Sequence, residues 1–415
     1  MARIKEERTI RRKRRTIIKL CIVGFAIFGF LSGCNLLISS IEFPEKEQPV
    51  LISQPGFQMH GVDEDIIQEI EDELDTIQIV MVGDMLMHEP IIKSGLGENG
   101  VYNFDHLFQN VKEYIEEADL AIANQETMMG GPAYGYTGYP SFNTPYALAD
   151  AEAKAGFDVL LFATNHAMDK GQKAIYNCMD YLDANRPELT YLGINRTQSD
   201  RNENIYVYEK NGMKIAILNY TYGTNGIDLP DDKPYLVNLL KEDKIRADIR
   251  KAEEIADFTI VCPHWGVEYN LGTSSDQRKW TKIFIEEGVD LVIGAHPHVI
   301  EPIEWVTDES GHEMLVYYSL GNFVNGTSST GHGVTNRMVG GIADVTLKRN
   351  EAGEVVVASY DAKEIVCHMA EGSDYTVYYM EDYTEEMASE NLILNQDEEF
   401  SKALCESIFD QVWGK

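Results

Sequence analysis

Two of the ten histidines, His296 and His298, stand on either side of a proline, directly after the apolar run 289–295. A short apolar run of this kind is typical of a buried strand, so both imidazoles are expected where a strand ends. Imidazole is the most common metal ligand among protein side chains. The pair therefore has two interpretations, a turn that happens to contain histidines or half of a metal site.

Four other apolar runs also end in side chains that bind metals or transfer protons. They are Asp84 and His88 after the first run, Asn124 and Glu126 after the second, Asn165, His166 and Asp169 after the third, and His264 and Glu268 after the fourth. In α/β sheets, ligands bind beyond the carboxyl ends of the strands. A single histidine at a strand end is usually structural, but five such ends meeting at one edge favour a functional site.

The residue types indicate which chemistry this site would do. Carboxylate, carboxamide and imidazole groups together suit Mn²⁺, Fe²⁺ or Zn²⁺, and a pair of ions can hold both the attacking and the leaving oxygen of a phosphoryl transfer. We expect one or two divalent ions. No cysteine belongs to these strand ends, which argues against a cysteine-rich structural zinc site. The chain also lacks the GxSxG, P-loop and GxGxxG motifs of serine hydrolases, nucleotide kinases and Rossmann enzymes.

Six segments occur in order along the chain: "VGDMLMH", "NQET", "ATNHAMDKG", "PHWGVEY", "IGAHPHVIEPIE" and "YYSLGNFV". Over about residues 77–367, this set resembles the bacterial capsule synthesis family, typified by CapA of poly-γ-glutamate synthesis. The resemblance implies an α/β fold like that of calcineurin-like metallophosphoesterases. Such a fold is a four-layer α/β/β/α sandwich with two packed mixed sheets.

The resemblance also implies roles for single residues. The implied metal ligands are Asp84, Glu126, Asn165, His264, His296 and His298. His166 would be the general acid or contact a phosphate. Three positions depart from the superfamily pattern: Glu126 replaces the usual bridging aspartate, Thr164 replaces a glycine, and His88 follows four residues after Asp84 in place of an Asp-x-His motif. These departures leave the number of ions open.

Several further residues have two interpretations each. The predicted catalytic residues are His166, Asp169 and Glu268. Asp169 either orients His166 or caps the following helix. Glu268 either acts as a base or metal ligand, or forms part of the pocket wall.

The residues predicted to contact substrate are His88, Asn124, Trp265, Asn322 and Arg337. Asn322 fits a turn equally well, and Arg337 is either an anion contact or an ordinary surface arginine. The loop 130–145, rich in glycine and tyrosine, is expected at the surface beside Glu126, where binding residues often lie.

Residues 1–34 have the pattern of an export segment. Residues 1–19 hold nine Lys or Arg and two Glu, and an uncharged apolar run follows. This run ends in "LSGC", which resembles the cleavage box of bacterial lipoproteins and implies lipidation of Cys34. The alternative is an uncleaved anchor, because Ile17 to Ile41 is long enough to span a bilayer. Either way the positive end stays in the cytoplasm, and we expect the body on the extracytoplasmic face of the cell membrane.

The remaining chain divides into an acidic tether (35–75), the α/β domain (76–368) and an acidic C-terminal extension (369–415) with a helix near 397–413. Strands are expected near 77–83, 119–123, 157–163, 213–219, 257–262, 289–294 and 314–319, and helices near 105–117, 145–155, 171–185, 238–255 and 275–287. The stretches 314–323, 338–348 and 354–367 have no helices between them, which predicts a second, more antiparallel sheet.

The charge balance limits the partners. Beyond residues 1–19, only 26 basic residues face 66 acidic ones, so this body should not bind nucleic acid. The resemblance implies a cell-surface anionic polymer such as poly-γ-glutamate, with a capsule ligase and its membrane subunits as partners. The negative charge opposes a polyanion, although charges beyond about 8 Å are screened at physiological salt. Three functions follow: a metal-dependent hydrolase, a non-catalytic tethering or assembly subunit, and a phosphoesterase for a small substrate.

Overall fold

The computed structural model describes residues 75–415 except 204, 328, 372–373 and 415. The predicted export segment with Cys34, and the predicted tether up to residue 74, lie outside the described residues. Residues Thr76–Lys415 form one compact unit. Within the part of the chain that the structure describes, no helix is long and apolar enough to cross a membrane.

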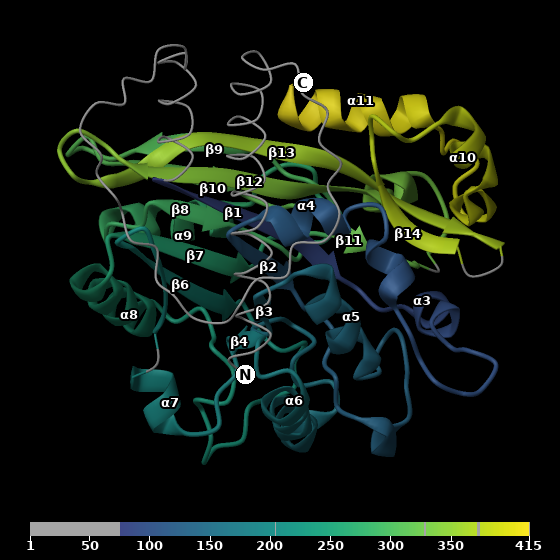
Figure 1. Cartoon of the computed structure of the whole chain (residues 1–415), viewed down its shortest axis with the longest axis horizontal. Helices are drawn as coiled ribbons and strands as arrows, with labels where there is room; N and C mark the ends of the chain where they lie inside the picture. The colour runs from purple at the N-terminus through teal and green to yellow at the C-terminus, as the bar shows by residue number, and fades with distance from the viewer. Residues whose placement is uncertain (1–74, 204, 328, 372–373, 415) are drawn as a thin grey trace, which may run out of the picture. The chain divides into compact units, whose positions relative to one another are not determined.

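Two mixed sheets form the centre of this unit (Figure 1). The first has the order β14 (Asp374–Tyr379), β13 (Val355–Ala370), β12 (Val339–Arg349), β1 (Thr76–Met85), β2 (Leu120–Asn124), β3 (Val159–Leu161) and β4 (Thr190–Leu192), with β11 (Asn322–Val324) also paired to β1. The second has the order β5 (Tyr206–Lys210), β6 (Met213–Thr221), β7 (Phe258–His264), β8 (Leu291–Ile293), β10 (Glu313–Tyr317) and β9 (Ile303–Thr307). Strands β1 to β4 are parallel, as are β6, β7 and β8.

Three hydrophobic cores separate four layers. Alternate residues of β1, such as Ile79 and Val80, point to opposite faces of the first sheet. Ile79 joins the core between the two sheets, while Val80 joins the core beneath α5 (Ala147–Ala155) and α6 (Gly171–Asn185). A third core lies between the second sheet and helices α8 (Glu242–Ile255) and α9 (Ser275–Glu286). The predicted α/β/β/α sandwich is confirmed, and burial of both sheet faces explains the continuous apolar runs.

The remaining elements are short. They are α3 (Glu89–Ser94), η1 (Asp105–Phe108), α4 (Lys112–Glu117), η2 (Pro132–Tyr134), α7 (Gln198–Glu203), η3 (Val334–Met338), α10 (Glu385–Glu390), η5 (Leu392–Asn395) and α11 (Lys402–Trp413). The helix predicted near 105–117 is thus two separate turns. The helix predicted near 397–413 begins later, because the Ser401 hydroxyl accepts from the Leu404 amide and caps α11 there.

The predicted separate antiparallel sheet is wrong. Strand β12 pairs antiparallel with the free edge of β1, and β13 and β14 continue the same sheet. Strand β10 instead pairs parallel with β8 in the other sheet. The C-terminal segment packs on this unit: Trp413 donates from its indole nitrogen to the Glu301 carbonyl at 2.9 Å.

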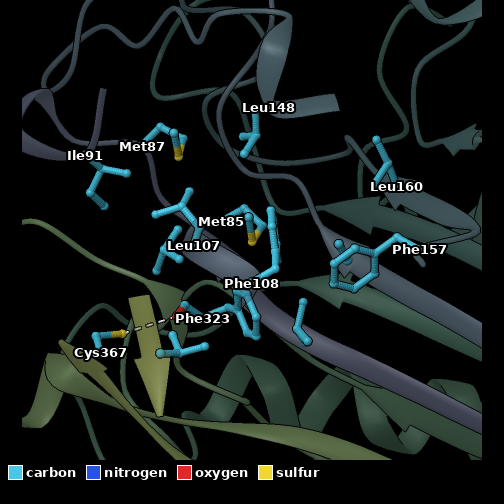
Figure 2. Packing of buried hydrophobic residues seen from close by; sticks show 14 of the residues in the cluster. Met85, Met87, Ile91, Leu107, Phe108, Leu148, Phe157, Leu160, Phe323 and Cys367 are labelled. Atoms are coloured by element: carbon cyan, nitrogen blue, oxygen red, sulfur yellow. Dashed lines mark hydrogen bonds between the residues drawn. The ribbon is translucent and has the colours of Figure 1, made fainter. Parts of the chain in front are cut away.

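An aromatic cluster packs around Phe323 of the short strand β11 (Figure 2). The Phe323 ring stacks on Phe108 with 5.8 Å between ring centroids and meets Phe157 edge-on at 6.5 Å. The Cys367 thiol donates to the Phe323 carbonyl at 3.3 Å. These contacts hold strand β11 in place, and with it its first residue, Asn322, opposite Asp84 of β1.

Candidate metal centre

The predicted ligands come from the carboxyl ends of strands in both sheets. Asp84 lies near the end of β1, Glu126 just after β2, and Asn165 in the turn after β3. His264 is the last residue of β7, and the segment 294–298 follows β8. The parallel strand order within each sheet places all these ends at one edge, where side chains of the two sheets meet.

Glu126 is the centre of the cluster. Its Oε1 atom lies 3.6 Å from His298 Nε2, 3.7 Å from His264 Nε2 and 4.0 Å from His166 Nε2. The Glu126 side chain is 1% exposed, and neither of its carboxyl oxygens has a hydrogen-bond partner. A buried carboxylate without partners is costly unless a cation compensates it.

Three groups of side chains bring ligand atoms within 4.8 Å of one another: Glu126 with His264 and His296, Asp84 with Glu126 and His298, and Glu268 with His296 and His298. Glu126 belongs to the first two groups, so it can bridge two ions. Asn165 Oδ1 lies 2.9 Å from His264 Nε2 and adds an oxygen to the first group. His296 Nδ1 is buried and has no hydrogen-bond partner. This donor set fits one or two divalent ions of the Mn²⁺, Fe²⁺ or Zn²⁺ type.

The electrostatics also favour a cation. Burial lowers the pKa of His264 and of His296, so both imidazoles are neutral and able to ligate at pH 7. Burial raises the pKa of Glu126 well above its usual range. Burial acts to lower the pKa of His298, but Glu126 and Asp84 outweigh it and raise that pKa to about 9. Both groups therefore bind protons more readily than usual, and a divalent ion would compete with those protons.

The histidine loop is held in a strained conformation. His296 has φ 104° and His298 has φ 59°, in a backbone region that residues other than glycine rarely adopt. The His296 amide donates to both Asp84 oxygens, at 3.2 and 3.3 Å. Gly294 lets the loop pack closely, because a Cβ there would lie 2.2 Å from the Tyr318 carbonyl oxygen.

His166 is bound at one nitrogen and faces the cluster with the other. Its Nδ1 lies 2.8 Å from Asp169 Oδ2, and the same oxygen accepts from the Phe142 amide at 2.7 Å. Asp169 does not cap the following helix, because Lys170 is the N-cap residue of α6 and no side chain makes a capping hydrogen bond there.

Asn225, which the sequence did not indicate, also contacts this part of the site. Its Nδ2 lies 3.4 Å from His166 Nδ1, and its Oδ1 lies 3.3 Å from Asn165 Nδ2. Its only signal was an Asn-Gly turn, and its φ of 50° agrees with one.

Two residues predicted to contact substrate instead orient ligands. Asn124 is 1% exposed and donates to Asp84 Oδ1 at 2.7 Å. Asn322 is fully buried, with its Oδ1 3.1 Å from His298 Nδ1 and its Nδ2 donating to the His298 carbonyl. Neither side chain has surface to offer a substrate, which corrects the prediction for both.

The predicted substrate contact by Trp265 is also wrong. Trp265 is fully buried, stacks on Phe284 and Tyr318, and donates from its indole nitrogen to the Tyr318 carbonyl. It lies in the core under α9, on the opposite side from His264, because consecutive residues of an extended chain alternate between faces.

Other side chains line the rim of the cluster. His88 meets Phe142 edge-on at 5.4 Å, and burial, followed by His298, lowers the pKa of His88 to about 3. Phe142 belongs to the predicted surface loop and packs on His166 at 4.7 Å. Glu268 is exposed at the rim, within reach of His296 and His298.

Residues 78–327, more than half of the chain, match a family model described as bacterial capsule synthesis protein PGA_cap. The chain belongs to this family. Two relatives are similar to it. The PGA biosynthesis protein CapA of Bacillus subtilis (strain 168) is 27% identical over 313 residues, which are 70% of this chain and 73% of the relative. The capsule biosynthesis protein CapA of Bacillus anthracis is 27% identical over 261 residues, 61% of this chain and 60% of the relative. The family indicated by the six segments is confirmed.

Solved structures similar to this PGA_cap family member include two from other bacteria. One is a phosphatase from Mycoplasma pneumoniae, with 16% identity and a TM-score of 0.44, covering 71% of this chain and 94% of that chain. Another is a 5′-nucleotidase precursor from Thermus thermophilus, with 13% identity and a TM-score of 0.42, covering 70% of this chain and 54% of that chain.

Proposed function

We propose that this PGA_cap family member is a metal-dependent hydrolase that cleaves a phosphoester or amide bond of an anionic surface polymer during capsule biosynthesis. The observation that carries the proposal is the carboxyl group of Glu126, which is buried, has no hydrogen-bond partner and is surrounded by three imidazole nitrogens. The name of the Bacillus subtilis relative, PGA biosynthesis protein CapA, supports poly-γ-glutamate as the polymer.

The residues divide the work between holding ions and moving protons. The ligands would be Asp84, Glu126, Asn165, His264, His296 and His298, with Glu126 shared between two groups. Divalent ions at such a site polarise the scissile group and lower the pKa of water. His166 keeps its Nδ1 on Asp169, which directs Nε2 toward the cluster. Its Nε2 is therefore placed to give a proton to the leaving group.

Metal analysis combined with turnover tests the proposal. The full-length chain, purified in detergent, should contain about one or two divalent ions, as the shared Glu126 allows, and should cleave γ-glutamyl polymer or a phosphodiester. Asp84→Ala and His296→Ala should lose both metal and turnover. If both variants keep wild-type metal content and turnover, the proposed site is wrong. Bound metal with no turnover on any of these substrates, and capsule formation that survives both substitutions, would instead support a tethering or assembly subunit. Turnover confined to small phosphate esters would support the phosphoesterase alternative.

We also propose that the protein is attached to the extracytoplasmic face of the cell membrane, where it meets the polymer and the capsule ligase with its membrane subunits. The support is the basic and apolar start of the sequence and its "LSGC" segment. The mature N-terminus of the wild-type chain separates the two kinds of anchor. A lipidated Cys34 as the first residue, found by mass spectrometry, would support the lipoprotein, whereas an intact basic segment ahead of residue 34 would support the uncleaved anchor.

A further inference from the structure

Arg337 differs from the other arginines of the described residues in having no carboxylate partner. The described residues contain eight arginines, and the other seven each form an ion pair with an Asp or Glu: Arg186, Arg196, Arg201, Arg246, Arg250, Arg278 and Arg349. The chain has 68 acidic and 35 basic residues, so carboxylate partners are plentiful. A half-buried arginine without one therefore suggests that an anion from elsewhere binds there.

Arg337 is held beside the histidine loop both by its guanidinium and by its main chain. Its Cζ lies 3.5 Å from the centroid of the Tyr269 ring, and that ring lies 6.0 Å from the His298 ring. The Arg337 carbonyl accepts from Asn322 Nδ2 at 2.9 Å, and Asn322 also contacts His298 Nδ1. Asn322 therefore links the position of Arg337 to that of the metal cluster.

Tyr269 is fixed in an uncommon conformation. Its φ is 66°, and its amide donates to the Pro297 carbonyl at 2.7 Å, in the middle of the histidine loop. The residue is nevertheless 44% exposed. The N–H groups of a guanidinium lie in its own plane, so a guanidinium stacked on an aromatic face keeps them free to donate.

The hydrogen-bond donors of Arg337 are largely unused. Nη1 makes one long contact, 3.4 Å to Thr327 Oγ1, and Nε is buried with no partner. Among the described residues, Nη2 has no hydrogen-bond partner either. A planar fork of this kind matches the two oxygens of a carboxylate or phosphate.

We propose that Arg337, stacked on Tyr269, receives an oxyanion of the substrate beside the metal cluster, and that the site is thereby selective for anionic substrates. This inference rests on the proposed function for the identity of the reaction, but the binding step itself needs no ion. Tyr269 is the positioning residue, because its ring orients the guanidinium. A carboxylate of a γ-glutamyl polymer and a phosphate group share the required chemistry.

Calorimetric titration separates the two sources of the oxyanion. The full-length chain in detergent and EDTA is titrated with inorganic phosphate and with a γ-glutamyl tripeptide. We expect at least one probe to bind, and Arg337→Gln to weaken that binding by about tenfold or more, as for loss of a charged hydrogen bond. If Arg337→Gln loses binding of the tripeptide, the oxyanion that Arg337 receives is a carboxylate. If it loses binding of inorganic phosphate, the oxyanion is a phosphate. Either result supports the proposal.

Two variants control for folding and for stacking. Arg278→Gln is the matched control, because Arg278 stacks on Tyr318 in the same way but is ion-paired with Glu304. Tyr269→Phe keeps the ring and should bind like wild type, whereas Tyr269→Leu should weaken binding in the same direction as Arg337→Gln. The proposal is overturned if neither probe binds the wild-type chain, or if Arg337→Gln and Arg278→Gln bind equally well. If the chain purified without EDTA contains no metal but still shows Arg337-dependent binding, the proposed function is refuted and this inference stands.

Discussion

The imidazole of His166 and the carboxyl group of Asp169 lie 2.8 Å apart, three residues apart in sequence, in the turn between β3 and α6. Asp169 is itself held by the Phe142 amide. This contact fixes which ring nitrogen carries the proton toward Asp169 and leaves Nε2 facing Glu126 at 4.0 Å. The pair therefore combines the two requirements of a general acid, orientation and a free nitrogen at the reacting centre.

Replacing His166 tests its role as a proton donor. His166→Gln should lower turnover of an unactivated phosphodiester or amide by about 10²- to 10⁴-fold, the usual range for general acid catalysis. A nitrophenyl ester should lose far less, because its leaving group departs without a proton. Turnover of both substrate types, with metal content by mass spectrometry, checks this. Equal losses for both substrates would contradict the role, and Asp169→Asn should give a smaller loss in the same direction.

Removing the charge of Glu126 tests the metal centre. Glu126→Gln preserves the shape of the side chain but removes the bridging carboxylate, so the bound metal should fall below half of the wild-type content. Glu152→Gln is the matched control. Glu152 is equally buried in α5, neither of its oxygens has a hydrogen-bond partner, and it belongs to none of the candidate ligand groups. Normal metal content in Glu126→Gln, or an equal loss in the control, would refute the centre as described.

The close packing of Gly294 predicts a large loss of stability on adding a single methyl group. In Gly294→Ala, the new Cβ would lie 2.2 Å from the Tyr318 carbonyl and 2.4 Å from the Trp265 indole nitrogen. Overpacking of this kind costs about 1–3 kcal/mol or more. Gly272→Ala should be neutral, because its Cβ would meet only Asn270 Oδ1 at 3.9 Å. Thermal unfolding of both variants checks the difference, and equal melting temperatures would contradict the described packing.

Glu301 predicts how stability depends on pH. Burial raises the pKa of Glu301 from 4.5 to about 8, against a hydrogen bond from Gln277 and the charge of Arg278. The folded state therefore favours the neutral carboxyl group. The stability that the folded state has with the Glu301 carboxyl group neutral is fully present below pH 4.5 and is lost as the pH rises through about 8. Glu301→Gln stays neutral, so its melting temperature relative to wild type should increase between pH 5 and pH 9. A difference that is constant or falls with pH would contradict this environment.

Much of the fold followed from local patterns. The strand near 77–83 and the helix 171–185 follow from runs of apolar residues and from helical spacing, which neighbouring residues determine among themselves. The pairing of β12 with β1 did not follow, because their residues are more than 250 positions apart and no periodicity records such a partner. The helix that was expected over 105–117 broke into two turns for a similar reason, since packing overrides the helical pattern.

The sequence by itself determined the family and the residue types that gather at the strand ends, because a strand followed by polar residues is a local pattern. The tertiary structure alone decided which way each side chain faces. His264 turns toward Glu126, whereas its neighbour Trp265 turns into the core. Asn225 entered the site from a loop without any strand pattern, and Tyr269, the last residue of the segment "PHWGVEY", was not predicted to take part. The sequence left Arg337 with two interpretations, and only the ion pairs of the other seven arginines distinguish it as unpaired, because the partner of a charge depends on distances in space.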